Sequence, residues 1–151
     1  MKPTRSLICS LLVSACSCAP ALAALGGDAT SVEADRVSLK GALHTAAEHT
    51  DYSVSEIRTS AGILVREYVS ADGQVFAVSW RGPGIPDLGQ LLGRYGAELA
   101  QAAPRPHFNH HHLSVETADV VFQSSGHTRA FFGRAWVPAL LPQNFSLNDI
   151  N

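Results

Sequence analysis

The sequence predicts an α+β fold: an antiparallel sheet of about five strands with one amphipathic helix packed on a face. Three β-rich runs between residues 52 and 80 are separated by short glycine-bearing loops, a pattern typical of an antiparallel meander. A second group of strand-like runs lies between residues 113 and 137 and includes a C-terminal hairpin. An apolar stripe at helical spacing over 87–101 predicts the helix.

The start of the chain has the pattern of a bacterial signal peptide. Basic residues precede a short apolar run, which is shorter than the roughly 20 residues that span a bilayer. Ala21-Leu22-Ala23 then presents small side chains of the kind that signal peptidase requires. We therefore expect a signal peptide over 1–23, one globular domain over 24–151, and an exported product in the periplasm or outside the cell.

A second processing route remains open. Val13-Ser14-Ala15-Cys16 resembles a lipobox, in which Cys16 would be lipidated and become the first residue. The site at Ala21-Leu22-Ala23 is cleaner and adjoins the start of the domain, so we favour secretion without a lipid anchor. Either route takes the protein out of the cytoplasm.

Composition excludes several classes of function. All three cysteines lie in the signal segment, so the exported domain would lack disulfides and cysteine nucleophiles. Removal of Lys2 and Arg5 leaves 9 Lys and Arg against 13 Asp and Glu, a net charge of −4. Without a basic cluster, nucleic acid is not an expected partner. The remaining sequence has no apolar stretch of membrane length.

The first helix is predicted over about residues 31–40. Thr30-Ser31-Val32-Glu33 has the spacing of a capping box, with Thr30 as N-cap and Glu33 reaching back to it. Gly41 weakens the end of this helix.

The meander is predicted from strands over 52–59, 63–69 and 74–80, with Asp72-Gly73 as the hairpin turn between the last two. The second helix is predicted as one continuous element over 87–101, with Asp87 as N-cap. Its apolar stripe consists of Leu88, Leu91, Leu92, Tyr95 and Leu99. We expect Leu91 and Leu92 to be buried.

The rest of the chain is predicted as a loop from Ala103 to His112 followed by short strands. These strands cover 113–116, 119–123 and 128–137, and Ser124-Ser125-Gly126-His127 is interpreted as the turn between the last two. The sequence has no internal repeat and no linker, which favours one domain.

Several stretches resemble a bacterial family without assigned function, the domain-of-unknown-function family 2844. They are 24–27, 62–69 (Gly-Ile-Leu-Val-Arg-Glu-Tyr-Val), 73–83 (Gly-Gln-Val-Phe-Ala-Val-Ser-Trp-Arg-Gly-Pro), 86–95 and 121–138. Their order spans nearly the whole expected domain. The resemblance implies export and a shared fold, and it implies no catalytic residues.

A cluster of histidines is the first candidate site. His107, His110 and His112 lie in or next to a proline-bearing loop, and imidazole is a common ligand of Zn²⁺ and Cu²⁺. His127 or Glu116 could add a ligand. The helical H-E-x-x-H pattern is absent, and adjacent histidines in such a loop are usually solvated polar residues. We therefore expect at best weak binding of Zn²⁺ or Cu²⁺ at His107, His110 and His112, and no other cofactor.

Ser124, Ser125 and His127 are the second candidate, as a hydrolase site. The strand–Gly-x-Ser-x-Gly–helix elbow is missing, and turn chemistry alone explains the serines. We expect no catalytic residues here.

Charged and aromatic residues on the strands are the remaining candidates. Glu56 and the Arg66-Glu67 pair are expected to form cross-strand pairs or to face water. The aromatic residues are Trp80, Phe131, Phe132 and Trp136, and Phe132 shares one strand face with Arg134 and Trp136. Aromatic side chains beside an arginine can line a binding groove, but we expect core packing.

Together these features favour a non-catalytic envelope or secreted accessory protein that binds another protein component. Metal binding through the histidine loop is the alternative hypothesis, and a hydrolase at Ser124 and His127 is the more distant one.

Overall fold

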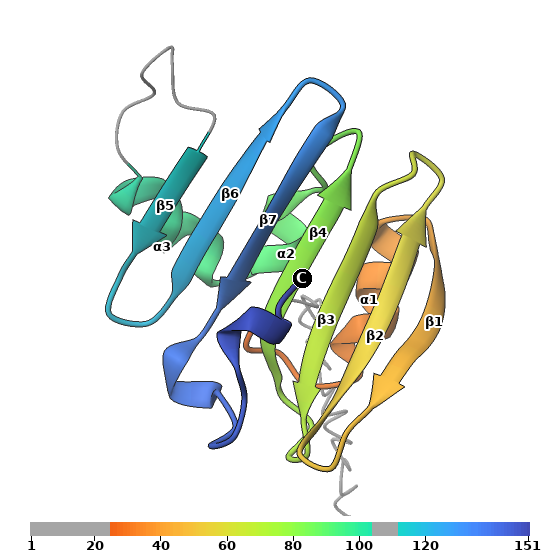
Figure 1. Ribbon diagram of the computed structural model, residues 1–151, viewed down its shortest axis with the longest axis vertical. Coiled ribbons are helices and arrows are strands. Elements are labelled where there is room, and N and C mark those ends of the chain that lie inside the picture. The colour runs from red at the N-terminus through yellow and green to blue at the C-terminus, as the bar shows by residue number, and fades with distance from the viewer. Residues whose placement is uncertain (1–24, 104–111) are drawn as a thin grey trace, which may run out of the picture.

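The computed structural model describes residues 25–103 and 112–151, and in these ranges all seven strands form one antiparallel sheet in the order β1-β2-β3-β4-β7-β6-β5 (Figure 1). The strands are β1 (Gly41–Glu48), β2 (Tyr52–Thr59), β3 (Leu64–Ser70), β4 (Val75–Gly82), β5 (His112–Glu116), β6 (Val121–His127) and β7 (Ala130–Trp136). The helices are α1 (Ser31–Ser38), α2 (Leu88–Leu92), α3 (Tyr95–Ala102) and the 3-10 turns η1 (Pro138–Leu140) and η2 (Leu147–Asp149). The predicted signal peptide (1–23), His107 and His110 lie outside the described residues.

The two faces of the sheet are covered differently. Helices α1, α2 and α3 lie on one face, and the segment after β7 crosses the middle of the other (Figure 1). The main core lies under the helices and includes Ile57, Val65 and Leu91, each fully buried. A second apolar cluster lies under the C-terminal segment, around Tyr68 and Phe76. The open part of that face lies over β7, β6 and β5.

The α+β fold predicted from the sequence is confirmed. The meander corresponds to β2, β3 and β4, and β6 and β7 form the C-terminal hairpin. The sheet has more strands than expected because β1 was not predicted. Its sequence, Gly-Ala-Leu-His-Thr-Ala-Ala-Glu, has few β-branched or aromatic residues. This edge strand forms by pairing with β2 rather than from its own pattern.

The prediction of a single helix over 87–101 is wrong in one respect. It is divided into α2 and α3, because Gly93 leaves the helical conformation with φ 48° and ψ −125°. The N-cap is confirmed, since the Asp87 carboxylate accepts a hydrogen bond from the Gln90 N–H over 3.1 Å. Leu91 and Leu92 are both buried, as expected. None of the described helices has the length and apolar character needed to cross a bilayer.

The capping box predicted at Thr30 is also wrong, although Thr30 is the N-cap residue of α1. The Asp28 carboxylate accepts hydrogen bonds from both the Thr30 N–H, over 2.8 Å, and the Thr30 hydroxyl. Glu33 pairs with Arg36 one turn along the helix instead of reaching back. The carboxylate that accepts hydrogen bonds at the start of α1 is therefore that of Asp28, which lies outside the predicted motif.

The turn predicted at Ser124-Ser125-Gly126-His127 is part of β6. The chain reverses at Thr128 and Arg129, and Arg129 has a φ of 66°. Gly126 is needed inside the strand, because a Cβ atom there would lie 2.7 Å from the Phe131 Cα. Ser125 is consequently a strand residue whose side chain faces one side of the sheet.

Candidate functional site

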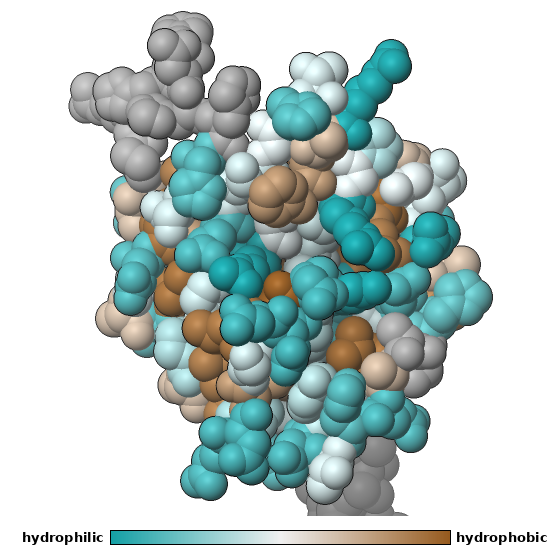
Figure 2. Space-filling view, viewed as in Figure 1, coloured by the Kyte–Doolittle hydropathy of each residue, from teal (hydrophilic) through white to brown (hydrophobic). Residues whose placement is uncertain are grey.

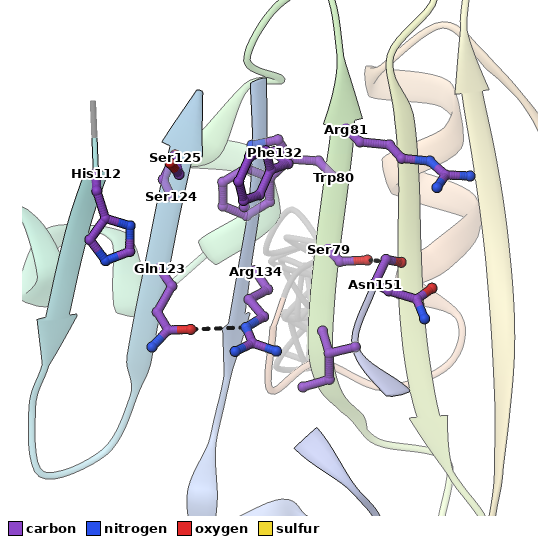
Figure 3. A pocket seen from close by; sticks show the side chains of 12 residues that line it. Ser79, Trp80, Arg81, His112, Gln123, Ser124, Ser125, Phe132, Arg134 and Asn151 are labelled. Carbon is purple, nitrogen blue, oxygen red and sulfur yellow. Dashed lines mark hydrogen bonds between the residues drawn. The ribbon is translucent and has the colours of Figure 1, made fainter. Parts of the chain in front are cut away.

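The open part of the sheet is hollowed into a groove of about 450 Å³, here called the open-face groove. Its floor and walls come from β4, β7, β6 and β5 and from Ile150 and Asn151 (Figure 3). Over this face, polar side chains gather in the middle and hydrophobic ones show between them (Figure 2). The volume lies in the range typical of small-molecule sites.

Strand register arranges the groove residues in two rows across four strands. The first row is Arg81, Phe132, Ser125 and His112, and the second is Ser79, Arg134 and Gln123, which Ser114 continues on β5 beside the groove. Residues directly opposite each other in a sheet point to the same face, and neighbouring strands are about 4.8 Å apart. Each row therefore presents four side chains over roughly 14 Å.

Arg134 is the guanidinium inside the groove. Its Nε donates to the Gln123 side-chain oxygen over 2.9 Å (Figure 3). Its NH1 donates to the main-chain oxygen of Leu147, also over 2.9 Å. The guanidinium carbon also lies 5.3 Å from the centre of the Trp136 ring. These contacts fix the orientation of the charge. Arg81 differs, because its side chain extends away from Phe132 toward β3 (Figure 3).

The C-terminal segment is held as one wall of the groove by hydrogen bonds to the sheet. The Ser79 hydroxyl and the Arg66 NH1 donate to the main-chain oxygen of Asn151, over 3.0 and 2.8 Å. The Asn151 N–H donates to the Tyr68 hydroxyl over 3.0 Å. Because β3 and β4 both contribute, the position of this wall depends on the centre of the sheet.

Aromatic residues divide between the core and the groove. Trp80 and Trp136 are buried, which confirms the expectation for these two residues. Phe132 is 58% exposed and lines the groove, so the core placement expected for it is wrong. The reason is that the C-terminal segment covers this side of β7 at Trp136, whereas none of the described residues covers it at Phe132.

The charged side chains that line the groove are basic. Arg81, Arg134 and His112 line it, and no aspartate or glutamate is among the described lining residues. The whole chain is nevertheless acidic, with a formal net charge of −2. The groove is therefore a locally basic site on an acidic protein, which favours anions.

A second polar cluster is buried between the helices and the sheet. Asp35 of α1 and Glu67 of β3 are each 1% exposed, and the Gln90 Nε2 donates to the Asp35 Oδ1 over 2.7 Å. Burial and the adjoining Asp35 raise the pKa of Glu67 to about 9, and burial also raises the pKa of Asp35. Glu67 is therefore protonated at neutral pH and can donate to Asp35.

The expectation for charged strand residues is thus only half right. Arg66 forms the expected cross-strand ion pair, with its Nε 3.2 Å from a carboxylate oxygen of Glu56. Glu67 faces neither water nor a basic partner, because the opposite face of β3 lies under α1.

The predicted metal residues are only partly within the described structure. His112 begins β5, is exposed and lines the open-face groove. No group of three potential metal ligands occurs in the part of the chain that the structure describes. His107 and His110 lie outside that part, so metal binding at His107, His110 and His112 stays a prediction.

Ser124 and His127 are three residues apart on the regularly paired strand β6, so their side chains leave on opposite faces. This arrangement does not support a nucleophile–base pair, which requires the two side chains within hydrogen-bonding reach.

The groove residues that sequence reasoning did not name are Gln123 and Ser79, whereas Arg134 was considered beside the aromatic residues as the lining of a groove and core packing was favoured instead. The one signal in the sequence was the spacing of Phe132, Arg134 and Trp136 at every second residue, which put them on one face of a strand. Nothing in the local pattern showed that this face would be open.

The fold and the groove define the class of protein: an antiparallel sheet with helices on one face and a half-open opposite face. A family model described as Protein of unknown function (DUF2844) matches residues 21–150. The chain belongs to this family, which confirms the resemblance seen in the sequence. No curated protein and no solved structure matches the chain. The function is therefore argued from the groove.

Proposed function

We propose that the protein is an exported, non-catalytic accessory protein of the bacterial envelope or secreted fraction, and that it binds its ligand in the open-face groove. The observation that carries this proposal is the groove of about 450 Å³ on an otherwise covered sheet. Its polar groups converge on one place from three strands: Ser79 from β4, Gln123 from β6 and Arg134 from β7. A cavity with a few fixed polar groups and an apolar lining is typical of a ligand site.

Binding is favoured over catalysis because the groove residues are engaged in fixing one another. The Ser79 hydroxyl donates to Asn151, and Gln123 accepts from Arg134. Covalent catalysis would need a hydroxyl held against a base. The export part of the proposal rests on the signal-peptide pattern before residue 24.

The site can be tested by nuclear magnetic resonance with isotopically labelled protein in its natural processed form. Mixtures of small fragments are added, and shifts of backbone amides are mapped. We expect the shifts to concentrate on β4, β7, β6 and β5 at the two rows. Shifts confined elsewhere, for example to the apolar groove of about 260 Å³ between α3 and β5, would contradict the proposal.

A matched pair of variants strengthens this test. Ser114→Trp places a large ring in the second row beside Gln123, and aromatic residues are well tolerated in strands. Ser60→Trp makes the same change in the exposed turn after β2. We expect fragment binding to be lost in Ser114→Trp and kept in Ser60→Trp, with both proteins folded.

A further inference from the structure

We infer that the open-face groove binds an organic carboxylate with a flat apolar body, the carboxylate on Arg134 and the body against Phe132. This inference deepens the proposed function and rests on it, since it names the class of ligand for the same groove. It is carried by the contacts of Arg134, by the exposure of Phe132 and by the charge of the groove.

Arg134 is a fixed cation without a carboxylate partner among the described residues. Both of its hydrogen-bond acceptors, the Gln123 amide oxygen and the Leu147 main-chain oxygen, are neutral. A guanidinium has five N–H groups, so three remain for a ligand. Its fork of parallel N–H groups matches the two oxygens of a carboxylate, and such charge-assisted pairs are stronger than neutral hydrogen bonds.

Orientation of the guanidinium before binding strengthens the argument. Gln123 on one side, Leu147 on another and the Trp136 ring along the strand restrict the side chain. A long side chain loses rotamer freedom when it binds, and a side chain that is already held loses less. Arg134 is therefore better suited to bind an anion than the exposed Arg81.

Phe132 supplies the apolar surface next to this charge. It lies two residues from Arg134 on β7, on the same face of the sheet, and is 58% exposed. Two residues along an antiparallel strand span about 6.8 Å, so one small molecule can contact both side chains. A flat aromatic body would cover the Phe132 ring and remove apolar surface from water.

The charge of the lining side chains disfavours a cationic ligand. Such a ligand would meet the Arg134 guanidinium, with no acidic side chain among the described lining residues to balance it. A neutral ligand would leave the Arg134 charge partly desolvated and unpaired, which is unfavourable. An anionic ligand is attracted by the basic lining side chains and pairs with the Arg134 charge.

The probes that test this are naphthalene-2-carboxylate and its neutral isostere naphthalene-2-carboxamide, with acetate as the charge without the apolar body. Affinities are measured by calorimetric titration of the processed protein, and the site is located by amide shifts. We expect the carboxylate to bind at least about 10-fold more tightly than the carboxamide, because hydrogen bonds to charged groups are worth more than neutral ones. Acetate should bind weakly.

Variants separate the two contacts. Arg134→Gln should weaken naphthalene-2-carboxylate about 10-fold or more and change the carboxamide little, whereas Phe132→Ala should weaken both naphthalene probes to a similar extent. Arg58→Gln is the matched control, because Arg58 is an exposed arginine that does not line the groove. It should leave both affinities unchanged.

The outcomes distinguish this inference from the proposed function. Equal affinities for the two naphthalene probes, no binding of the carboxylate at millimolar concentration, or an unchanged carboxylate affinity in Arg134→Gln would each overturn the inference. Binding of both probes in the groove without preference for the anion would leave the proposed function standing. Shifts away from the groove would remove both. The comparison of probes needs no variant, so it decides even if Arg134→Gln folds poorly.

Discussion

Glu67 and Asp35 show how single side chains depart from their usual roles when they are buried. Two carboxyl groups from β3 and α1 meet in the layer between helices and sheet, with Gln90 as the hydrogen-bond donor to Asp35. Two adjoining negative charges in a buried site would repel each other, so one of the carboxyl groups keeps its proton. The raised pKa of Glu67, about 9, is the consequence.

The first prediction concerns the pH dependence of stability. In the folded protein the pKa of the Glu67 carboxyl is raised to about 9, whereas in the unfolded chain its pKa has the ordinary value of 4.5. The folded state thus binds more protons across this window, and the free energy of unfolding falls as pH rises, by up to about 1.4 kcal/mol per pH unit. In Glu67→Gln the neutral amide does not titrate, so this contribution is absent.

Urea unfolding at pH 5, 6, 7 and 8 measures this effect as the difference between the variant and the wild type. We expect the variant to gain stability relative to the wild type as pH rises. Glu33→Gln is the control, because the Arg36 partner lowers the pKa of Glu33 and places its titration below the window. Parallel pH profiles for the wild type and Glu67→Gln would contradict the raised pKa of Glu67.

The elements are held in place by apolar contacts with the sheet more than by their own helix propensity. Helices α2 and α3 are short, and Gly93 separates them. Isolated helices of this length are not stable in water. Both helices are attached to the core by the buried residues of the apolar stripe, which are Leu91, Leu92, Tyr95 and Leu99. The stripe predicted from the sequence therefore holds α2 and α3 on the sheet, although Gly93 separates them.

The second prediction follows from this packing. Leu91 is fully buried, and Leu91→Ala should lower the free energy of unfolding by about 2–5 kcal/mol, because the lost side chain leaves a cavity. Leu147→Ala removes the same atoms at a residue that is 38% exposed and should have a much smaller effect. Denaturant midpoints of the two variants provide the measurement. Equal midpoints would mean that α2 does not pack as described.

In the whole molecule, the two faces of the sheet have different roles. The helix-covered face holds the main core, and the opposite face is covered only where the C-terminal segment crosses it (Figure 1). The open-face groove lies at the edge of that cover, between Asn151 and β5. A ligand site at this boundary can be shaped without disturbing the core.

The third prediction concerns the maturation of the whole chain. We expect the exported protein to begin at Ala24, because Ala21-Leu22-Ala23 has the small residues that signal peptidase requires. Leu25 already belongs to the core, with 1% exposure and its N–H donating to the Leu91 main-chain oxygen over 3.0 Å. The intact mass of protein from the native host measures the new terminus.

Two variants separate this route from lipidation. Ala23→Tyr should block cleavage at Ala24, and Cys16→Ser should leave the mature mass unchanged. A diacylated product that begins at Cys16 would show instead that the lipobox is the true processing site.

Local sequence patterns predicted the elements whose own residues carry the signal. The β-rich composition of β2, β3 and β4, the Asp72-Gly73 turn and the apolar stripe of α2 and α3 are all signals within a few residues. Family membership was likewise visible in the order of short stretches. The edge strand β1 was not predicted, because few of its residues are β-branched or aromatic. It is defined by its pairing with β2, which its own sequence does not reveal.

The candidate site was decided by contacts between distant parts of the chain. Pairing of β4 with β7 places Ser79 beside Arg134, and the same register places Arg81 opposite Phe132. The burial of Glu67 depends on where α1 lies, and the exposure of Phe132 depends on where the C-terminal segment ends. The sequence by itself determined which residues alternate on a strand and which stripe of a helix is apolar. Only the tertiary structure decided which face of each strand is covered, because that depends on packing between segments that local periodicity does not encode.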